Sequence, residues 1–256
     1  MNPFGMTRLA RRSLIASAAA ALVPGAPAHA QLGSSWFLLP GSARDVGTGP
    51  DGSIFVIGVD RQTSAGFGIH RWNGSAFEAG AGAGMRIAVD PKGNPWVVNR
   101  QSEIWAWDGN GFARMPGSAN DIGIGADGTV CVIGTNDRSS AGWPIYRWNG
   151  RSWASFPGYG TNISVDPEGR PWVVNEQNAI YRWTGSAFQR EPVSAVDIGI
   201  GADGSVWAAG TDGKAHHYWR GTWAPIIDSR DVRRIAVDRN GMPLITNRND
   251  QILVRV

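Results

Sequence analysis

Short runs of alternating apolar and polar residues fill the chain from about Trp36 onward, and the runs are separated by glycine and asparagine. A run such as Arg86 to Asp90 places its two branched apolar side chains two positions apart, which is the period of a β-strand. No long stretch has the period of an amphipathic helix. The pattern predicts an all-β protein of many short strands joined by tight turns.

A turn glycine recurs along the chain, at Gly52, Gly93, Gly128, Gly169, Gly204 and Gly241. The spacings are 41, 35, 41, 35 and 37 residues, so long and short repeats alternate and two repeats form a unit of 76 residues. Periods of this size are typical of propeller blades.

The first strand of each repeat has glycine, alanine or serine at its third position, a composition that suits the crowded inner edge of a propeller blade. The first positions of these strands are Asp45, Arg86, Asp121, Asn162, Asp197 and Arg234. Because acid and non-acid alternate in this series, we expect a ring of Asp–Arg pairs at one end of a central channel, partly screened by water.

The second strand carries a bulky apolar residue at one fixed position, which Cys131 occupies in the third repeat. We therefore interpret Cys131 as a small core residue rather than a reactive thiol. The strand ends at glycine or asparagine, both of which tolerate turn conformations, at Gly58, Asn99, Gly134, Asn175, Gly210 and Asn247.

The third strand ends at a tryptophan in most repeats, and the fourth strand carries an aromatic residue. The last repeat lacks its fourth strand, whereas the segment from Ser35 to Pro40 has the aromatic-to-proline spacing of Arg151 to Pro157. We predict a six-bladed β-propeller of four-stranded blades over residues 31–256, whose ring is closed by the N-terminal strand.

Several motifs point to chemistry that their context excludes. Gly123 to Gly128 and Gly199 to Gly204 match a dinucleotide-binding pattern but run into strands rather than a helix. His70 and His217 are assigned to one strand-three column of packing aromatics, and acidic turns are read as Asx turns. Without a triad or an isolated carboxylate pair, we expect no catalysis, no cofactor and no metal site.

Three runs resemble the repeats of the tectonin and tachylectin family: Asp121 to Gly128, Ile145 to Gly150 and Pro171 to Asn175. The resemblance covers nearly all of residues 31–256, and the fifth and sixth repeats depart from it at Lys214 to Trp219 and Leu244 to Asn247. It implies a lectin that recognises bacterial lipopolysaccharide or O-methylated glycans.

Ligand contacts are expected at the strand-three indoles and at the asparagines that end strand two: Trp72, Trp107, Trp148, Trp183, Trp219, Asn99, Asn175 and Asn247. Indole faces stack on sugar rings, and amides meet hydroxyl groups. Two alternatives stay open at this point. The indoles pack between blades, or the propeller is a scaffold for protein–protein interaction in the cell envelope.

Residues 1–30 have the features of an export signal, with Arg8, Arg11 and Arg12 before a short apolar run and a small-x-small site at Ala28 to Ala30. The Arg pair resembles a twin-arginine signal, and a general secretory signal would look similar. Residues 31–256 then carry 21 basic and 21 acidic residues, which gives no electrostatic case for binding nucleic acid. The apolar run is too short to span a membrane, so we expect a periplasmic or secreted protein.

Cleavage after Ala30 should leave Gln31 as the first residue of the exported form. Intact-mass measurement on periplasmic or extracellular material checks this expectation. A mass that still includes residues 1–30 would show that the segment is not a cleaved signal.

Overall fold

The computed structural model describes residues 35–256, which form 22 β-strands. The predicted signal, residues 1–30, lies outside the described residues. The strands are β1 (Trp36–Thr48), β2 (Ile54–Gly58), β3 (Phe67–Trp72), β4 (Phe77–Gly84), β5 (Arg86–Val89), β6 (Pro95–Val98), β7 (Glu103–Trp107), β8 (Phe112–Ser118), β9 (Asp121–Ile124), β10 (Val130–Ile133), β11 (Trp143–Trp148), β12 (Trp153–Gly160), β13 (Asn162–Val165), β14 (Pro171–Val174), β15 (Ala179–Trp183), β16 (Phe188–Ile200), β17 (Val206–Gly210), β18 (Ala215–Trp219), β19 (Thr222–Pro225), β20 (Val232–Val237), β21 (Pro243–Asn247) and β22 (Gln251–Arg255).

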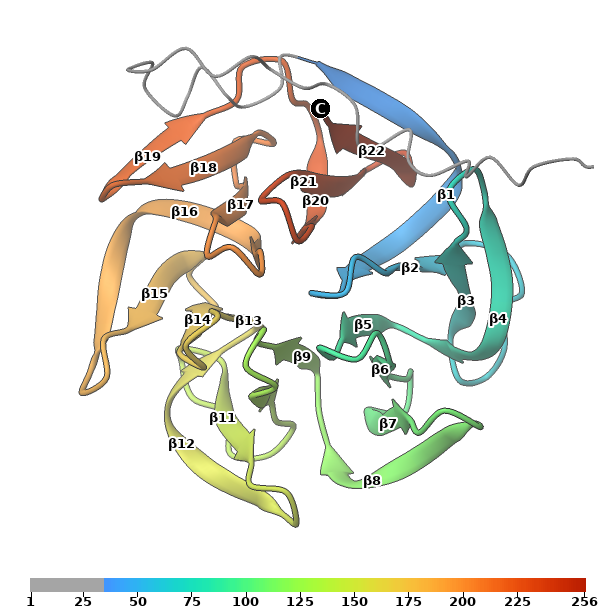
Figure 1. The fold of residues 1–256 in the computed structure, drawn as a ribbon. Helices are drawn as coiled ribbons and strands as arrows, with labels where there is room; N and C mark the ends of the chain where they lie inside the picture. The colour runs from blue at the N-terminus through green and yellow to red at the C-terminus, as the bar shows by residue number, and fades with distance from the viewer. Residues whose placement is uncertain (1–34) are drawn as a thin grey trace, which may run out of the picture.

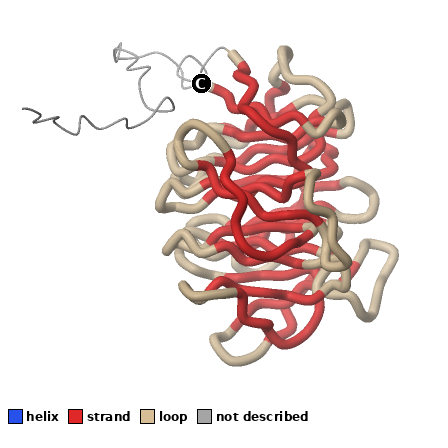
Figure 2. Tube along the Cα trace, turned by 90° about the vertical axis from the view of Figure 1, so that its right-hand side faces the viewer, coloured by secondary structure: helices blue, strands red, loops and turns tan. Residues whose placement is uncertain are grey.

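The strands form antiparallel sheets arranged in a ring around one axis (Figure 1). Two sheets have four strands, β5 to β8 and β9 to β12, and two have seven. The seven-stranded sheets have the orders β20-β21-β22-β1-β2-β3-β4 and β13-β14-β15-β16-β17-β18-β19. Seen edge-on, the strands make up the body of the ring and loops project from both of its faces (Figure 2). The all-β prediction is confirmed.

The long strands β1 and β16 each pair with two different neighbours along their length. Trp36 to Ser42 pairs with β22, and Ala43 to Thr48 pairs with β2. In the same way, β16 pairs first with β15 and then with β17. Each seven-stranded sheet therefore consists of two four-stranded units that share one strand.

Pairing of β1 with β22 confirms that the N-terminal strand closes the ring. The separate four-stranded sheets that we predicted are found only for β5–β8 and β9–β12. Elsewhere β1 and β16 continue from one unit into the next. Between β4 and β5, by contrast, Met85 leaves its own sheet and donates its N–H to the Val98 carbonyl of the next one (2.7 Å), which ends the strand.

The six predicted turn glycines all adopt positive φ, from 77° at Gly169 to 92° at Gly52, a region that side-chain-bearing residues rarely occupy. Acidic side chains brace these turns, as expected for Asx turns. Asp127, for example, accepts the amide of Thr129 (2.9 Å).

Apolar side chains fill the spaces between neighbouring units. Phe55 and Ile69 of one unit, for instance, pack with Ile87 and Val97 of the next. Cys131 is fully buried in such a cluster, and burial raises the pKa of its thiol to about 12. The prediction that Cys131 is a core residue is confirmed.

The alternating repeat lengths come from the loops between strands two and three. The long loop of the first unit reaches over the second, where the Ala65 carbonyl accepts the amide of Arg100 (2.8 Å). The long loop of the third unit does the same, and the Ala141 carbonyl accepts the amide of Glu176 (3.0 Å). Each long repeat thus braces the short repeat that follows it.

Deleting residues 1–41 removes the outer strand that pairs with β22, together with Trp36 and Leu39, which pack on the adjoining core. We expect the free energy of unfolding to fall by at least about 3–5 kcal/mol, the scale of a large core truncation. Urea unfolding measures the change. A variant lacking only residues 1–34 is the control, and equal stability of the two variants would contradict the closure role.

Candidate ligand-binding sites

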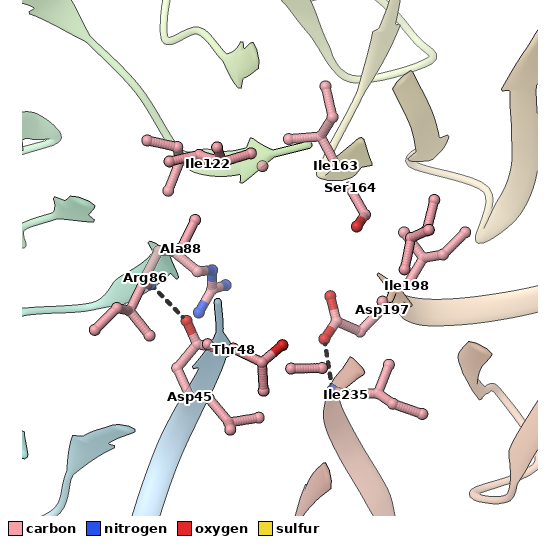
Figure 3. Close-up of a pocket in the computed structure, with 18 of the residues that line it drawn as sticks. Asp45, Thr48, Arg86, Ala88, Ile122, Ile163, Ser164, Asp197, Ile198 and Ile235 are labelled. Atoms are coloured by element: carbon pink, nitrogen blue, oxygen red, sulfur yellow. Dashed lines mark hydrogen bonds between the residues drawn. The ribbon is translucent and has the colours of Figure 1, made fainter. Parts of the chain in front are cut away.

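The central channel is lined by the innermost strands β1, β5, β9, β13, β16 and β20 (Figure 3). Its free volume is about 70 Å³, less than that of any of the hollows that lie between neighbouring units. The channel is therefore a poorer place for a sugar than those hollows are.

Three buried aspartates lie on alternate inner strands, and each binds the backbone of the next inner strand around the channel. Asp45 accepts the N–H of Ile87 (2.9 Å), and Asp121 accepts that of Ile163 (2.8 Å). Asp197 does the same for Ile235 (2.9 Å; Figure 3). Each carboxylate thus joins two neighbouring units.

Two arginines complete the predicted ring. The Nε of Arg86 lies 3.3 Å from Asp121 Oδ1, and Arg234 Nη1 lies 3.6 Å from Asp197 Oδ1. Asn162 takes the third non-acidic place and donates to Asp197 (3.2 Å), so three carboxylates share two guanidinium groups.

Burial raises the pKa of Asp121 to about 7, against the opposing charge of Arg86. Burial also raises the pKa values of Asp45 and Asp197. We expected pairs screened by water. The structure corrects this, because the carboxylates are only 6–9% exposed.

Hollows of one common design lie between neighbouring units, on the side where strand two ends. Three of them have volumes of about 430, 320 and 150 Å³. Each is lined by an inner residue of strand two, a strand-three side chain, the strand-four aromatic and a glycine of the preceding unit's fourth strand. The strand-three residues are Trp105, His70 and Tyr146, respectively.

The largest hollow lies between the β1–β4 and β5–β8 units and combines aromatic walls with amide and carboxylate groups. Trp105 and Phe112 line it and are partly buried. Asn99, Gln101 and Glu103 supply its polar groups. The Asn99 amide donates to Glu103 (2.8 Å), and Gln101 donates to the carbonyl of Ser64 in the long loop (2.8 Å). These bonds hold the polar groups in place around the aromatic walls.

The predicted asparagines are buried turn residues. The Asn99 side-chain oxygen accepts the amides of Gln101 (3.0 Å) and Glu103 (2.9 Å), and Asn175 and Asn247 bind their own turns in the same way. Their exposed fractions are 6–8%. Of the three, Asn99 shapes a turn that lines a hollow, whereas the Asn175 and Asn247 amides hold their own turns.

Four of the predicted indoles are partly buried and pack against the aromatic residue directly opposite on strand four. The ring centroids are 4.9–5.2 Å apart in the pairs Trp72–Phe77, Trp107–Phe112, Trp148–Trp153 and Trp183–Phe188. Trp107 also lines a hollow of about 300 Å³. Because Asn99 precedes β7 and Trp107 ends it, the structure does not bring these two residues together.

The fifth repeat is one residue out of the predicted register. Ala215 lies opposite Ala209, the place that isoleucine takes in other repeats, and Tyr218 lies opposite Trp223, the place of the packed indole. Trp219 follows that place and is 37% exposed. His216, not His217, shares the column of His70, and His217 packs on Trp207 with ring centroids 4.3 Å apart. The predicted register of the fifth repeat is wrong, because it placed Trp219 with the other strand-three tryptophans on residue type alone.

Sequence reasoning missed Trp105, Gln101 and Glu103. The sequence carried a signal for Glu103, which differs from the equivalent Ala179 and Gln251. It carried none for Gln101, which recurs as Gln177 with the same bond to the preceding long loop, or for Trp105, which lies in a column of mostly aromatic residues. Their convergence on one hollow depends on how neighbouring units pack.

Residues 35–256 contain no group of three or more side chains that could hold a metal ion. A search of the same part of the chain for a helix able to cross a membrane found none.

A ring of radial antiparallel sheets with a narrow central channel defines a β-propeller. The family model of the Tectonin domain matches residues 83–172, 131–230 and 161–256, which together extend over more than half of the chain. The chain belongs to the tectonin family, as its repeats indicated.

Two solved structures share the fold. A structure of YCF48 bound to D1 peptide has 13% identity and a TM-score of 0.54, covering 87% of this chain and 94% of that chain. A streptogramin B lyase structure has 16% identity and a TM-score of 0.54, covering 87% and 86%. Comparison with curated proteins gave no match.

Replacing Asp121 by asparagine should reduce the pH dependence of stability. The unfolded chain loses this proton near the ordinary pKa of 3.8, whereas the folded protein keeps it up to about pH 7. The folded state binds more protons in this window, so the free energy of unfolding falls as pH rises through it. Asp121→Asn removes this titration and can keep the bond to Ile163.

Urea unfolding at pH 5 and pH 8 measures the effect, and the wild type should lose more stability than Asp121→Asn between the two. Asp108→Asn is the control, because turn amides lower the pKa of this exposed carboxyl and it is ionised throughout the window. Equal losses in the wild type and Asp121→Asn would contradict a protonated channel aspartate.

Proposed function

We propose that this protein is an exported, six-bladed propeller lectin that binds bacterial surface glycans, such as lipopolysaccharide or O-methylated sugars, without turnover. The blade count follows from treating each half of β1 and β16 as part of a different four-stranded blade. The hollow around Trp105 carries the proposal, because it joins an aromatic wall to fixed amide and carboxylate groups.

Sugar recognition needs both of these features. The C–H face of a pyranose packs on an indole, and hydroxyl groups donate to carboxylate or amide oxygens. The carboxylate of Glu103 can accept further hydrogen bonds, because each of its oxygens has one partner: one oxygen accepts from Asn99, and the other lies 3.1 Å from Arg114. Apolar surface from Phe112 and Val97 would also accept an O-methyl group.

Similar hollows at His70 and Tyr146 support binding through several sites on one rigid ring. A polymeric glycan that reaches two such sites binds more tightly than one sugar does, because the second contact becomes intramolecular. Of the predicted asparagines, Asn99 acts here as part of the frame of the Trp105 hollow. Trp72, Trp107, Trp148 and Trp183 act as packed indoles whose free faces remain candidates for ligand contact.

Protein binding is the second candidate function. The likeness to YCF48 bound to D1 peptide supports it, because the same fold accommodates a peptide there. The streptogramin B lyase neighbour raises catalysis as a third candidate, but the sequence offers no catalytic triad or isolated carboxylate pair. We therefore keep binding as the proposal.

Replacing Trp105 by alanine should weaken glycan binding by at least about tenfold, the effect of about 1.4 kcal/mol. A glycan array with purified protein identifies the ligand, and calorimetry then compares the variants. Trp219→Ala is the matched control, because this indole is exposed and out of register with the packed ones. Absence of binding to any glycan at millimolar concentration would favour the protein scaffold instead.

A further inference from the structure

We propose that a second hollow, at the opposite end of the same interface between units, binds an acidic sugar group, either a carboxylate or a phosphate. This hollow has a volume of about 300 Å³ and is lined by Arg71, Lys92 and Trp107. The inference rests on the proposed glycan-binding function and assigns a charge preference to a separate site.

The two hollows are separated along the strands. Strand β6 starts at Pro95, in the wall of the second hollow, and ends just before Asn99, in the wall of the first. Phe112 lines both and lies between them. A substitution of Arg71 or Lys92 therefore leaves the lining of the Trp105 hollow unchanged, and a substitution of Trp105 leaves that of the second hollow unchanged.

The second hollow offers an indole edge and an apolar floor for a sugar ring. Trp107 packs against Phe112 in an edge-to-face pair, with centroids 5.2 Å apart and planes at 76°. Ile69 and Pro95 complete the apolar part of the lining. A pyranose can rest against this surface while its acidic group faces the cations.

The pair of cations is particular to this interface. Arg71 lies opposite Phe55, and the equivalent strand-three positions are Ala106, Arg147, Arg182, His217 and Val254. Lys92 precedes a turn glycine, and the equivalent turn positions are Asp51, Asp127, Glu168, Asp203 and Asn240. At each interface, the strand-three position of one repeat can be compared with the turn position of the next repeat. The two positions hold Arg147 and Glu168 at one interface, and Arg182 and Asp203 at another. Only Arg71 and Lys92 combine two positive charges.

Neighbouring acids do not neutralise this pair. Within residues 35–256, neither Arg71 nor Lys92 has a carboxylate within 4.0 Å. Asp90 accepts the amides of its own turn, including that of Lys92 (2.8 Å). Glu78, which pairs with Arg71 across the strands, accepts from Asn73 (2.6 Å). Asp51, whose carboxylate lies against Gly93 beside Lys92, accepts from the amide and the hydroxyl of Ser53 (3.0 and 2.6 Å). None of these three acids forms an ion pair with Arg71 or Lys92, so both cations can pair with an added anion.

An acidic group placed between a guanidinium and an ammonium gains two charge-assisted hydrogen bonds. Calorimetry with glucuronate, glucose 6-phosphate and methyl glucoside tests this on the full-length protein. Wild type should bind at least one of the two acidic sugars about tenfold or more tightly than the neutral one, and the stronger of the two identifies the acidic group.

The double variant Arg71→Gln/Lys92→Gln should lose this preference, while its binding of the neutral glycan found on the array stays unchanged. Arg147→Gln is the matched control, since this arginine has the same strand position but the equivalent turn position of the next repeat holds Glu168 in place of a lysine, and it should keep the preference. Equal binding of acidic and neutral sugars by wild type, or a preference that survives the double variant, would overturn the inference.

The two proposals fail in different ways. Loss of neutral-glycan binding in Trp105→Ala with no acidic preference in wild type would leave the lectin function standing and refute the second site. Binding of an acidic sugar that depends on Arg71 and Lys92, without any neutral-glycan binding, would support the second site and refute the proposed role of the Trp105 hollow.

Discussion

Six inner strands lie close together around one axis. This close packing determines which side chains fit on the inner strands and how neighbouring units are joined. A side chain at Gly123 would place its first carbon 2.8 Å from the Ile163 carbonyl oxygen, and one at Gly199 would meet Ile235 at the same distance. Only very small residues fit at this position. Because the strands approach so closely, a buried carboxylate on one strand can also bind the backbone of the next, as Asp45, Asp121 and Asp197 do.

Because the inner strands lie close together around the axis, neighbouring units lie farther apart at their outer strands. Aromatic residues of strands three and four fill these wider gaps, as in the Trp148–Trp153 pair. Where the filling is incomplete, hollows remain between units. Hollows in this fold are thus a consequence of its geometry, and their chemistry depends on the residues that depart from the repeat.

Residues that depart from the repeat give each interface between units a different set of side chains and charges. Trp105 and Glu103 distinguish the largest hollow from its neighbours, and Lys92 replaces an acid or amide found in the other repeats. In the channel, Asn162 takes the place where a third arginine would balance the charge, and burial raises the pKa of Asp121. The repeated residues maintain the ring, while single substitutions provide its candidate functions.

The sequence alone determined the all-β class, the repeats, the turn glycines, the core role of Cys131 and the closing strand. These features depend on local periodicity and on positions that recur, and such signals survive without knowledge of contacts. Only the tertiary structure decided that Asn99 and Trp107 lie apart, that Trp219 is out of register and that β1 and β16 each join two units. Those outcomes depend on pairing and packing between repeats, where residues far apart in the sequence meet and where residue type no longer indicates which neighbour a side chain contacts.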